Sequence, residues 1–204
     1  LRRAVAGLQF VPGGTQLVEE DAPFSDIKLR YLNTWRGWGI GLSSKVVKPA
    51  QGDVSPFYKF IQATFGHEDP RHADYLVRRL AWMFQQPLAK HPTWIYLIGA
   101  PMQGKSALIK LISSLVGQAY VSNIDEKAMQ SSFSEWRAEK LLITLDDSSV
   151  QQRHAVQQLL KRVTTEEASQ VEKKWQSQYT APNYSTSFFA ANGTEALIEH
   201  DDRR

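Results

Sequence analysis

Short apolar runs alternate with helical patterns through the second half of the chain. Runs rich in β-branched and aromatic residues, each bounded by glycine, proline or polar residues, predict strands at 94–98, 119–123, 140–145 and 187–191. Apolar residues at helical spacing predict one helix directly after residue 106 and another over 151–163. This alternation of strands and helices predicts an α/β fold.

The first 49 residues show no regular pattern and are predicted to form an irregular, extended arm. Their most apolar part, residues 31–40, is aromatic and interrupted by glycine (YLNTWRGWGI). Two interpretations apply to these aromatic residues. They pin the arm onto the next domain, which we favour, or they stack on nucleic-acid bases.

Two helices are predicted before the first strand of the α/β part. Ser55 and Pro56 predict a helix start, because serine caps a helix and proline fits its first turn, and this helix should end at Gly66. The second should cover residues 69–86. Its buried stripe is expected to contain Tyr75, Leu76, Leu80, Met83 and Phe84, and its outer face Arg71, Arg78 and Arg79. We therefore expect an N-terminal arm with a small, mainly helical domain at 1–92 and a second domain at 93–204.

The junction between the strand at 94–98 and the next helix carries a complete G-x-x-x-x-G-K-S motif. A strand before the motif and a helix after it favour a phosphate-binding loop over an ordinary turn with two glycines. Glycines allow the backbone N–H groups to point at a phosphate, and the helix N-terminus adds partial positive charge. The predicted phosphate-binding residues are Gly99, Ala100, Pro101, Met102, Gln103, Gly104, Lys105 and Ser106.

The side chains of this motif predict a site for ATP and Mg²⁺. Lys105 is expected to reach the β- and γ-phosphates, and the hydroxyl of Ser106 to ligate Mg²⁺. The apolar run at 140–145 ends in Asp146 and Asp147, an acidic pair at a strand end. Asp146 is expected to hold Mg²⁺ together with Ser106, and Asp147 to polarise the water that attacks the γ-phosphate.

Two further segments are candidates for function. Asn192 ends the strand at 187–191, where it is placed to hold the attacking water or sense the γ-phosphate, although Asn192-Gly193 also fits a plain turn. Residues 170–179 alternate with a period of two and predict a hairpin. Its Lys173, Lys174 and Trp175 combine positive charge with a ring and are candidate DNA contacts; the alternative is a solvated hairpin.

Composition excludes several classes of protein. The chain contains no cysteine, which excludes disulfides, zinc–thiolate sites and cysteine catalysis. Its net charge of +3 is compatible with nucleic acid without indicating it. No apolar run is long enough for a membrane span and no signal peptide is visible, so we expect a cytoplasmic protein without a membrane partner. The ends of the chain suggest a piece of a longer protein.

The order of these parts is specific: a phosphate loop, an acidic strand end, a basic hairpin, a strand-end asparagine and then Asp202-Arg203-Arg204. This order resembles the superfamily 3 helicases, and within them the primase-associated helicases of phages, plasmids and large DNA viruses. The resemblance covers most of the chain. It implies a P-loop NTPase fold of the AAA+ type, with a parallel sheet and flanking helices.

The resemblance also implies roles for individual residues. Residues 161–175 would be a motif whose hairpin projects into the channel of a ring, and Asn192 would be a sensor. One of Arg203 and Arg204 would act as an arginine finger on the nucleotide of the neighbouring subunit; the alternative is a plain charged C-terminus. Two features depart from the pattern: Asp147 stands where many ATPases have glutamate, and Thr164-Thr165 replaces the glycines often found before the channel hairpin.

These features together predict an ATP hydrolase, a superfamily 3-like DNA helicase or translocase of a phage, plasmid or other mobile element. It is expected to act on single-stranded DNA in DNA replication. It is also expected to form a homo-oligomeric ring, with six subunits as the preferred number. A primase domain on the same longer chain is a further expected partner. Two alternatives stay open: a nucleotide-gated DNA-binding or assembly module with little turnover, and a P-loop kinase.

Overall fold

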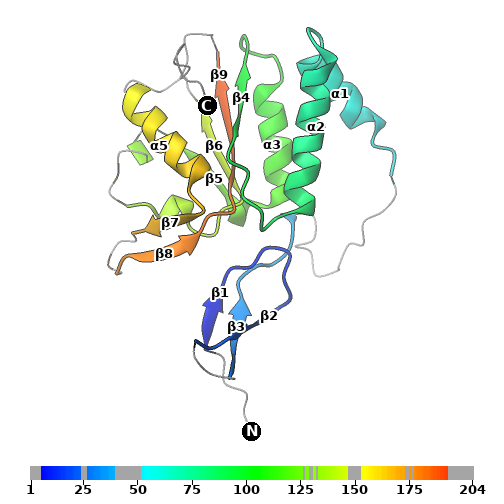
Figure 1. Ribbon diagram of the computed structural model, residues 1–204. Helices are drawn as coiled ribbons and strands as arrows, with labels where there is room; N and C mark the ends of the chain where they lie inside the picture. Colours follow the sequence, from blue (N-terminus) through cyan, green and yellow to red (C-terminus); the bar gives the residue numbers. More distant parts are fainter. Residues whose placement is uncertain are drawn as a thin grey trace.

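A four-stranded parallel sheet forms the centre of the molecule (Figure 1). The computed structural model describes residues 6–23, 27–39, 52–125, 127–128, 131, 133–146, 153–172, 175 and 177–192. The strands of the sheet lie in the order β4 (Trp94–Ile98), β9 (Thr186–Ala191), β6 (Leu142–Asp146) and β5 (Val121–Ile124). The predicted α/β fold and its strands are confirmed.

Helices cover both faces of this sheet, because its strands are apolar on both sides. One face packs against α1 (Ser55–Phe65), α2 (Pro70–Gln85) and α3 (Lys105–Val116), with Ile95 and Leu97 of β4 in this core. The other face packs against α5 (Arg153–Thr165), with Trp94 and Tyr96 of β4 against that core. The predicted helices are confirmed, and α1 and α2 share one core with β4 and α3. The expected serine cap of α1 is wrong, because Ser55 is the first helical residue, and Val54 before it makes no side-chain cap bond.

The expectation of an irregular arm is wrong, because the arm contains a three-stranded sheet. Its strands are β1 (Gly7–Gln9), β2 (Leu17–Asp21) and β3 (Lys28–Asn33), and β3 pairs in parallel with β1 and antiparallel with β2. The preferred interpretation of the aromatic residues is confirmed at Trp35 and Trp38, which pack against the main core. The ring of Trp35 lies 4.7 Å from that of Tyr120.

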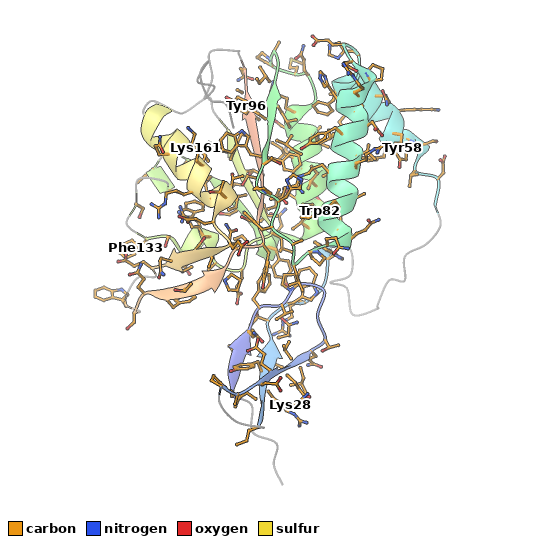
Figure 2. All side chains as sticks on the ribbon, in the orientation of Figure 1. Lys28, Tyr58, Trp82, Tyr96, Phe133 and Lys161 are labelled. Atoms are coloured by element: carbon orange, nitrogen blue, oxygen red, sulfur yellow. The ribbon has the colours of Figure 1, made fainter. Side chains whose placement is uncertain are left out.

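Two residues of α2 lie on the opposite side from that predicted. Tyr75, expected in the buried stripe, is 51% exposed, and Arg79, expected on the outer face, is 3% exposed. Arg79 lies over the ring of Trp82 at 5.0 Å and donates from Nη2 to Oγ1 of Thr186 at the start of β9. Figure 2 labels Trp82 on α2. Arg79 is three residues from Leu76 and four from Met83, so it lies on the same helix face as these buried residues.

The predicted hairpin is present as β7 (Ala168–Val171) and β8 (Tyr179–Pro182). Because β8 is followed closely by the first residue of β9, the hairpin lies near the amino ends of the sheet strands (Figure 1). Two short 3₁₀ helices, η2 (Gln118–Tyr120) and η3 (Glu135–Arg137), precede and follow β5 along the chain. None of the helices in the described part of the chain is long and apolar enough to traverse a membrane.

Candidate nucleotide site

The predicted phosphate loop lies at the carboxyl edge of the sheet, between the end of β4 and the start of α3. Gly99 extends the pairing of β4 with β9 by donating its N–H to the carbonyl oxygen of Ala191 at 3.3 Å. In the strand register, Ile98 of β4 is paired with Ala191, and Asp146 of β6 is paired with Ala190. The tips of these three strands are therefore neighbours, in the order β4, β9, β6.

Two residues with positive φ angles produce the sharp turn of the loop. Gly104, the residue before α3, has φ of 83°, and Met102 has φ of 67°. A side chain at position 104 would be strained by this dihedral angle and would also meet Cγ2 of Thr64 at 2.8 Å. Gly104 therefore permits both the turn and the close approach of α1 to the loop.

Lys105 turns back over the loop instead of extending into solvent. Its side chain donates from Nζ to the carbonyl oxygens of Gly99 at 2.6 Å and Ala100 at 2.8 Å, and the residue is 7% exposed. The ammonium group therefore lies inside the curve that the loop describes. Ser106 follows on the first turn of α3 and is exposed. A helix N-terminus, an ammonium group and a hydroxyl group are thus gathered at one end of α3.

The pairing of β4, β9 and β6 brings the acidic strand end and the strand-end asparagine close to this loop. Asp146 is the last residue of β6, and Asn192 follows the last residue of β9 and is exposed. Since β9 lies between β4 and β6, its tip is next to both the loop and the acidic strand end. Asp147 and the side chain of Asp146 lie outside the described residues.

Of the other predicted contacts, only Trp175 belongs to the part of the chain that the structure describes. Lys173, Lys174, Arg203 and Arg204 lie outside the described residues. Trp175 is described; it lies between β7 and β8 with φ of 65° and is 91% exposed. The hairpin that carries it is near the amino ends of the sheet strands, opposite the phosphate loop (Figure 1).

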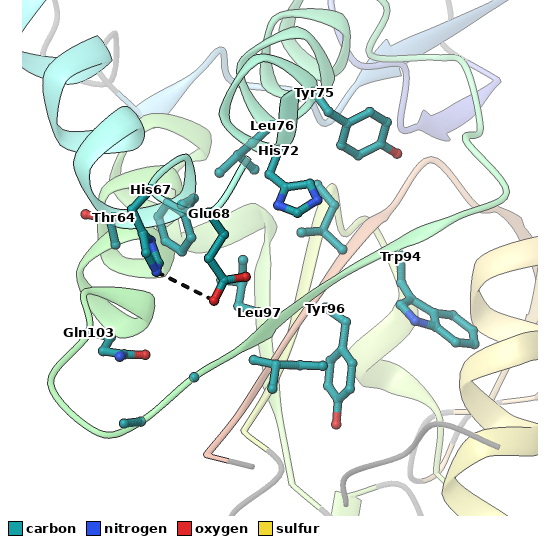
Figure 3. A pocket seen from close by; sticks show the side chains of 15 residues that line it. Thr64, His67, Glu68, His72, Tyr75, Leu76, Trp94, Tyr96, Leu97 and Gln103 are labelled. Atoms are coloured by element: carbon teal, nitrogen blue, oxygen red, sulfur yellow. Dashed lines mark ion pairs between the residues drawn. The ribbon is translucent and has the colours of Figure 1, made fainter. Parts of the chain in front are cut away.

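A groove that the sequence did not predict adjoins the loop (Figure 3). It encloses about 690 Å³ and runs beside β4, from Trp94 to Gly99, Ala100 and Gln103 of the loop. Its other wall comes from the end of α1 and the start of α2, including His67, Glu68, His72 and Tyr75. Nε2 of His67 lies 3.8 Å from Oε1 of Glu68, a contact that is an ion pair when the imidazole is protonated. No sequence motif joins these two walls.

A cluster of buried and half-buried cations lies at the opposite end of the sheet. Lys90 donates from Nζ to the carbonyl oxygens of Val163 in α5 at 2.9 Å and of Ser185 at 2.8 Å. Burial lowers the pKa of Lys90 to about 7, and the positive charges of Arg79 and Arg137 act in the same direction. Burial also lowers the pKa of Arg79 to about 10. These groups lie where the hairpin joins the sheet and were not predicted as a cluster.

The chain belongs to a family described as a family of unknown function, DUF5906, whose model matches residues 97–204. It is also 25% identical over 180 residues to the DNA primase-polymerase of Nitratiruptor phage NrS-1. That match covers 86% of this chain and 24% of the phage protein.

Solved structures of the C-terminal region of NrS-1 have a similar fold. The apo structure of residues 305–718 superposes with a TM-score of 0.78 at 21% identity, covering 98% of this chain and 46% of that one. An A-form apo structure of the same region gives a TM-score of 0.76 at 20% identity, covering 98% of this chain and 45% of that one. The chain thus spans less than half the length of these solved relatives.

Proposed function

We propose that this chain is the ATP-hydrolysing part of a DNA helicase or translocase, a P-loop ATPase of the AAA+ type related to superfamily 3. The main observation in support of this proposal is that three strand ends meet at one edge of the sheet. The loop after β4, Asp146 at the end of β6 and Asn192 after β9 are neighbours there, although up to 93 positions separate them in the sequence. Ligands of open parallel sheets bind at this edge.

Each group at this edge has a role in the proposed reaction. The loop N–H groups and Lys105 would hold the phosphates of ATP, with Lys105 exchanging the carbonyl oxygens of Gly99 and Ala100 for phosphate oxygens. Ser106 and Asp146 offer the hard oxygen ligands that Mg²⁺ prefers, and the metal would neutralise phosphate charge when bound. Asp147 would orient and polarise the attacking water, and Asn192 would hold that water from the adjacent strand end.

The likeness to a DNA primase-polymerase supports a role in phage or mobile-element DNA replication. It also favours the expectation that a longer chain carries a primase domain beside this one. The proposed DNA contact is the hairpin with Lys173, Lys174 and Trp175, in the channel of a homo-oligomeric, hexameric ring. Because the hairpin and the phosphate loop lie at opposite ends of the sheet, hydrolysis would have to be coupled to the hairpin through β9 and α5.

ATPase measurements with and without single-stranded DNA test this function. A translocase should hydrolyse ATP faster when DNA is added, and Lys105→Ala should abolish both rates. Turnover that DNA does not change would favour a P-loop kinase, and nucleotide binding with negligible turnover would favour an assembly module. The double variant Lys173→Ala/Lys174→Ala should lose the DNA stimulation and keep the DNA-free rate, because only phosphate neutralisation at the hairpin is removed.

Mixing two inactive variants tests the proposed ring. Lys105→Ala removes the loop cation of a subunit, and Arg203→Ala/Arg204→Ala removes the proposed finger from its neighbour's site. An arginine finger typically contributes about 10³–10⁵ in rate, so each variant alone should be nearly inactive. Mixtures that co-assemble should recover part of the ATPase rate, because some sites receive an intact loop and an intact finger. Co-assembled mixtures without recovery would contradict a site shared between subunits.

A further inference from the structure

We propose that Ser134 is a positioning residue for the DNA contact, because it holds the outer edge of the hairpin strand β7. This inference rests on the proposed function, in which the hairpin carries Lys173, Lys174 and Trp175. It concerns a different property of the hairpin, namely how the strand that leads to these contacts is kept in place before DNA binds. Every contact that supports it lies at or before Glu172, within the described residues.

Three hydrogen bonds join Ser134 to β7. Its hydroxyl donates to the carbonyl oxygen of Gln170 at 2.9 Å and accepts from the N–H of Glu172 at 2.9 Å. Its own N–H donates to the carbonyl oxygen of Glu172 at 3.0 Å. The other edge of β7 is paired with β8, where Gln170 lies opposite Thr180. Ser134 therefore takes the place that a third strand would occupy beside the hairpin, and Figure 2 labels Phe133, the residue before it, in this region.

The hydroxyl of Ser134 is not used within its own segment. Ser134 is the N-cap residue of η3, and a serine at this position usually accepts from an N–H group of the helix that it precedes. Ser134 makes no such bond, and its hydroxyl contacts residues 36 and 38 positions further along the chain. The function of this side chain in the fold is therefore to bind the hairpin.

The hairpin requires this support because it is short. β7 and β8 have four residues each, and a two-stranded hairpin is at most marginally stable by itself. Val171 is fully buried, whereas Trp175, four positions further on, is 91% exposed. Freedom that remains in the hairpin must be lost when DNA binds, and this ordering lowers the affinity. A strand held at Glu172 reduces that cost for the turn that follows it.

Ser134 is itself fixed to the central sheet. Trp136, two positions after it, packs against the core that contains Leu145 of β6. Arg137 lies over the ring of Trp136 at 4.9 Å, and its Nη1 is 3.8 Å from Oε2 of Glu166. The hairpin is therefore held, through Ser134, relative to the strand that leads to the acidic strand end.

Titration of a labelled single-stranded oligonucleotide with Ser134→Ala tests this inference. The dissociation constant should rise by about 2- to 10-fold, the range that corresponds to the net contribution of one neutral hydrogen bond. ATPase rates without DNA and at saturating DNA should equal those of the wild type, because the DNA-bound complex keeps its contacts. Ser134→Thr retains the hydroxyl and should restore the wild-type affinity. Ser131→Ala is the matched control, because Ser131 is exposed and its hydroxyl accepts from the N–H of Phe133 in the same segment.

Hydrogen exchange measures the contact itself, without DNA or nucleotide. The amide of Glu172 should exchange faster in Ser134→Ala than in the wild type and Ser131→Ala, because its acceptor is removed. Unchanged exchange at Glu172 would mean that Ser134 does not hold this strand, and the inference would be wrong.

The binding outcomes separate this inference from the function on which it rests. If Ser134→Ala binds DNA as tightly as the wild type, other contacts hold the hairpin, and the inference fails while the proposed function stands. A matching loss of the DNA-free ATPase rate would assign Ser134 to the support of the ATPase core, which also overturns the inference. So would a failure of Ser134→Thr to restore binding. If the wild type binds no single-stranded DNA, or Lys173→Ala/Lys174→Ala binds it equally well, the proposed DNA contact and this inference fall together.

Discussion

Nζ of Lys105 donates to the carbonyl oxygen of Gly99 at 2.6 Å, so the lysine of the phosphate loop is bonded to the first residue of the same loop. A second bond, to the carbonyl oxygen of Ala100 at 2.8 Å, holds the ammonium group in the same place. The loop therefore positions its own cation before any phosphate arrives. Binding a phosphate exchanges neutral acceptors for anionic ones, which adds the attraction between opposite charges to the hydrogen bonds of the ammonium group.

Lys105→Ala should abolish nucleotide binding, with an affinity loss of at least about 100-fold, because the variant lacks the ammonium group inside the loop. Calorimetric titration with ATP and Mg²⁺ measures this loss. Lys110→Ala is the matched control, since Lys110 is an exposed lysine on the same helix. ATP binding by Lys105→Ala at wild-type affinity would exclude the loop as the phosphate site.

Gly104→Ala should lower the free energy of unfolding by about 1–3 kcal/mol and weaken nucleotide binding. The cost has two sources: a left-handed backbone at φ of 83° and a Cβ atom placed 2.8 Å from Cγ2 of Thr64. Gly52→Ala is the control, because a Cβ atom there meets nothing within 4 Å. Urea denaturation of both variants makes the comparison. Equal stabilities would mean that the approach of α1 to the loop is not a constraint.

Local signals explain which parts of the fold are predictable. The apolar run of β4 predicts that strand at its observed bounds. Ser55 and Pro56 mark the start of α1, although Ser55 is its first helical residue and does not cap it. The three strands before residue 34 are short, with three to six residues each, and only residues 27–31 show the alternation of a strand, which the expectation of an irregular arm left out. Their pairing is also partly non-local, since Gly7 is paired with Tyr31. No window of the sequence contains that information.

The error at Arg79 has a different origin. The helical period places this residue on the buried face of α2 with Leu76 and Met83, whereas its charge favours exposure. In the structure, the aliphatic part of the side chain is covered, and its guanidinium lies over Trp82 and bonds Thr186. Helical spacing is the better guide at this position, because a charged group can be buried when tertiary contacts hold it.

The candidate site also has one part that the sequence predicts and one part that it does not. The loop is predictable because its eight positions are contiguous and each has a chemical reason. The groove is not, because residues 64–76 and 94–98 form its walls only after α1 packs against Gly104. The adjacency of Asp146 and Asn192 depends on the insertion of β9 between β4 and β6, which the order of segments in the sequence does not reveal.

Asn192→Ala should leave ATP affinity nearly unchanged and lower the rate of hydrolysis by about 100-fold, the lower part of the range for removing one positioned hydrogen-bonding group from an active site. The reason is its place after β9, between the loop and the acidic strand end. Single-turnover hydrolysis measured beside calorimetric binding separates the two effects. A parallel loss of binding would assign Asn192 to the nucleotide contacts, and an unchanged rate would mean that it forms only a turn.

Asn183→Ala should lower the free energy of unfolding by about 2–4 kcal/mol, because several buried hydrogen bonds lose a partner. Asn183 is 7% exposed and donates from Nδ2 to the carbonyl oxygens of Val163 and Glu166, each at 2.8 Å. Its Oδ1 accepts from the hydroxyl of Ser185 at 2.6 Å. These bonds join the hairpin, the end of α5 and the start of β9.

The measurement for Asn183 is urea denaturation, with Gln85→Ala as the control because Gln85 is an exposed amide at the end of α2. If the hairpin couples hydrolysis to DNA, Asn183→Ala should also reduce the stimulation of ATPase activity by single-stranded DNA. A stable Asn183→Ala variant, within about 0.5 kcal/mol of the wild type, would show that the hairpin is held by other contacts.

Lys90 should make the stability of the protein increase as the pH rises above about 7. Its pKa is about 7 in the folded protein, compared with 10.5 for an ordinary lysine. Burial and the positive charges of Arg79 and Arg137 lower this pKa by more than the negative charge of Glu166 raises it. Between these two values the unfolded chain binds the additional proton, so the free energy of unfolding rises with pH by up to a few kcal/mol. Below about pH 7 both states are protonated and Lys90 contributes no slope. A neutral amine retains two N–H groups for Val163 and Ser185, so the bonds at 2.9 and 2.8 Å persist after deprotonation.

Denaturation of the wild type, Lys90→Met and Lys110→Met between pH 6 and about pH 9 tests this linkage. The range stops there because burial raises the pKa values of Tyr120 and Tyr184, and their ionisation would lower stability at higher pH. The wild type and the exposed-lysine control Lys110→Met should share the upward slope, and Lys90→Met should lose it whatever its absolute stability. If Lys90→Met keeps the wild-type slope, Lys90 is charged in the folded protein throughout this pH range. Its three hydrogen-bond acceptors must then compensate for the cost of burying the charge. These are the carbonyl oxygens of Val163 and Ser185 and the hydroxyl of Ser185.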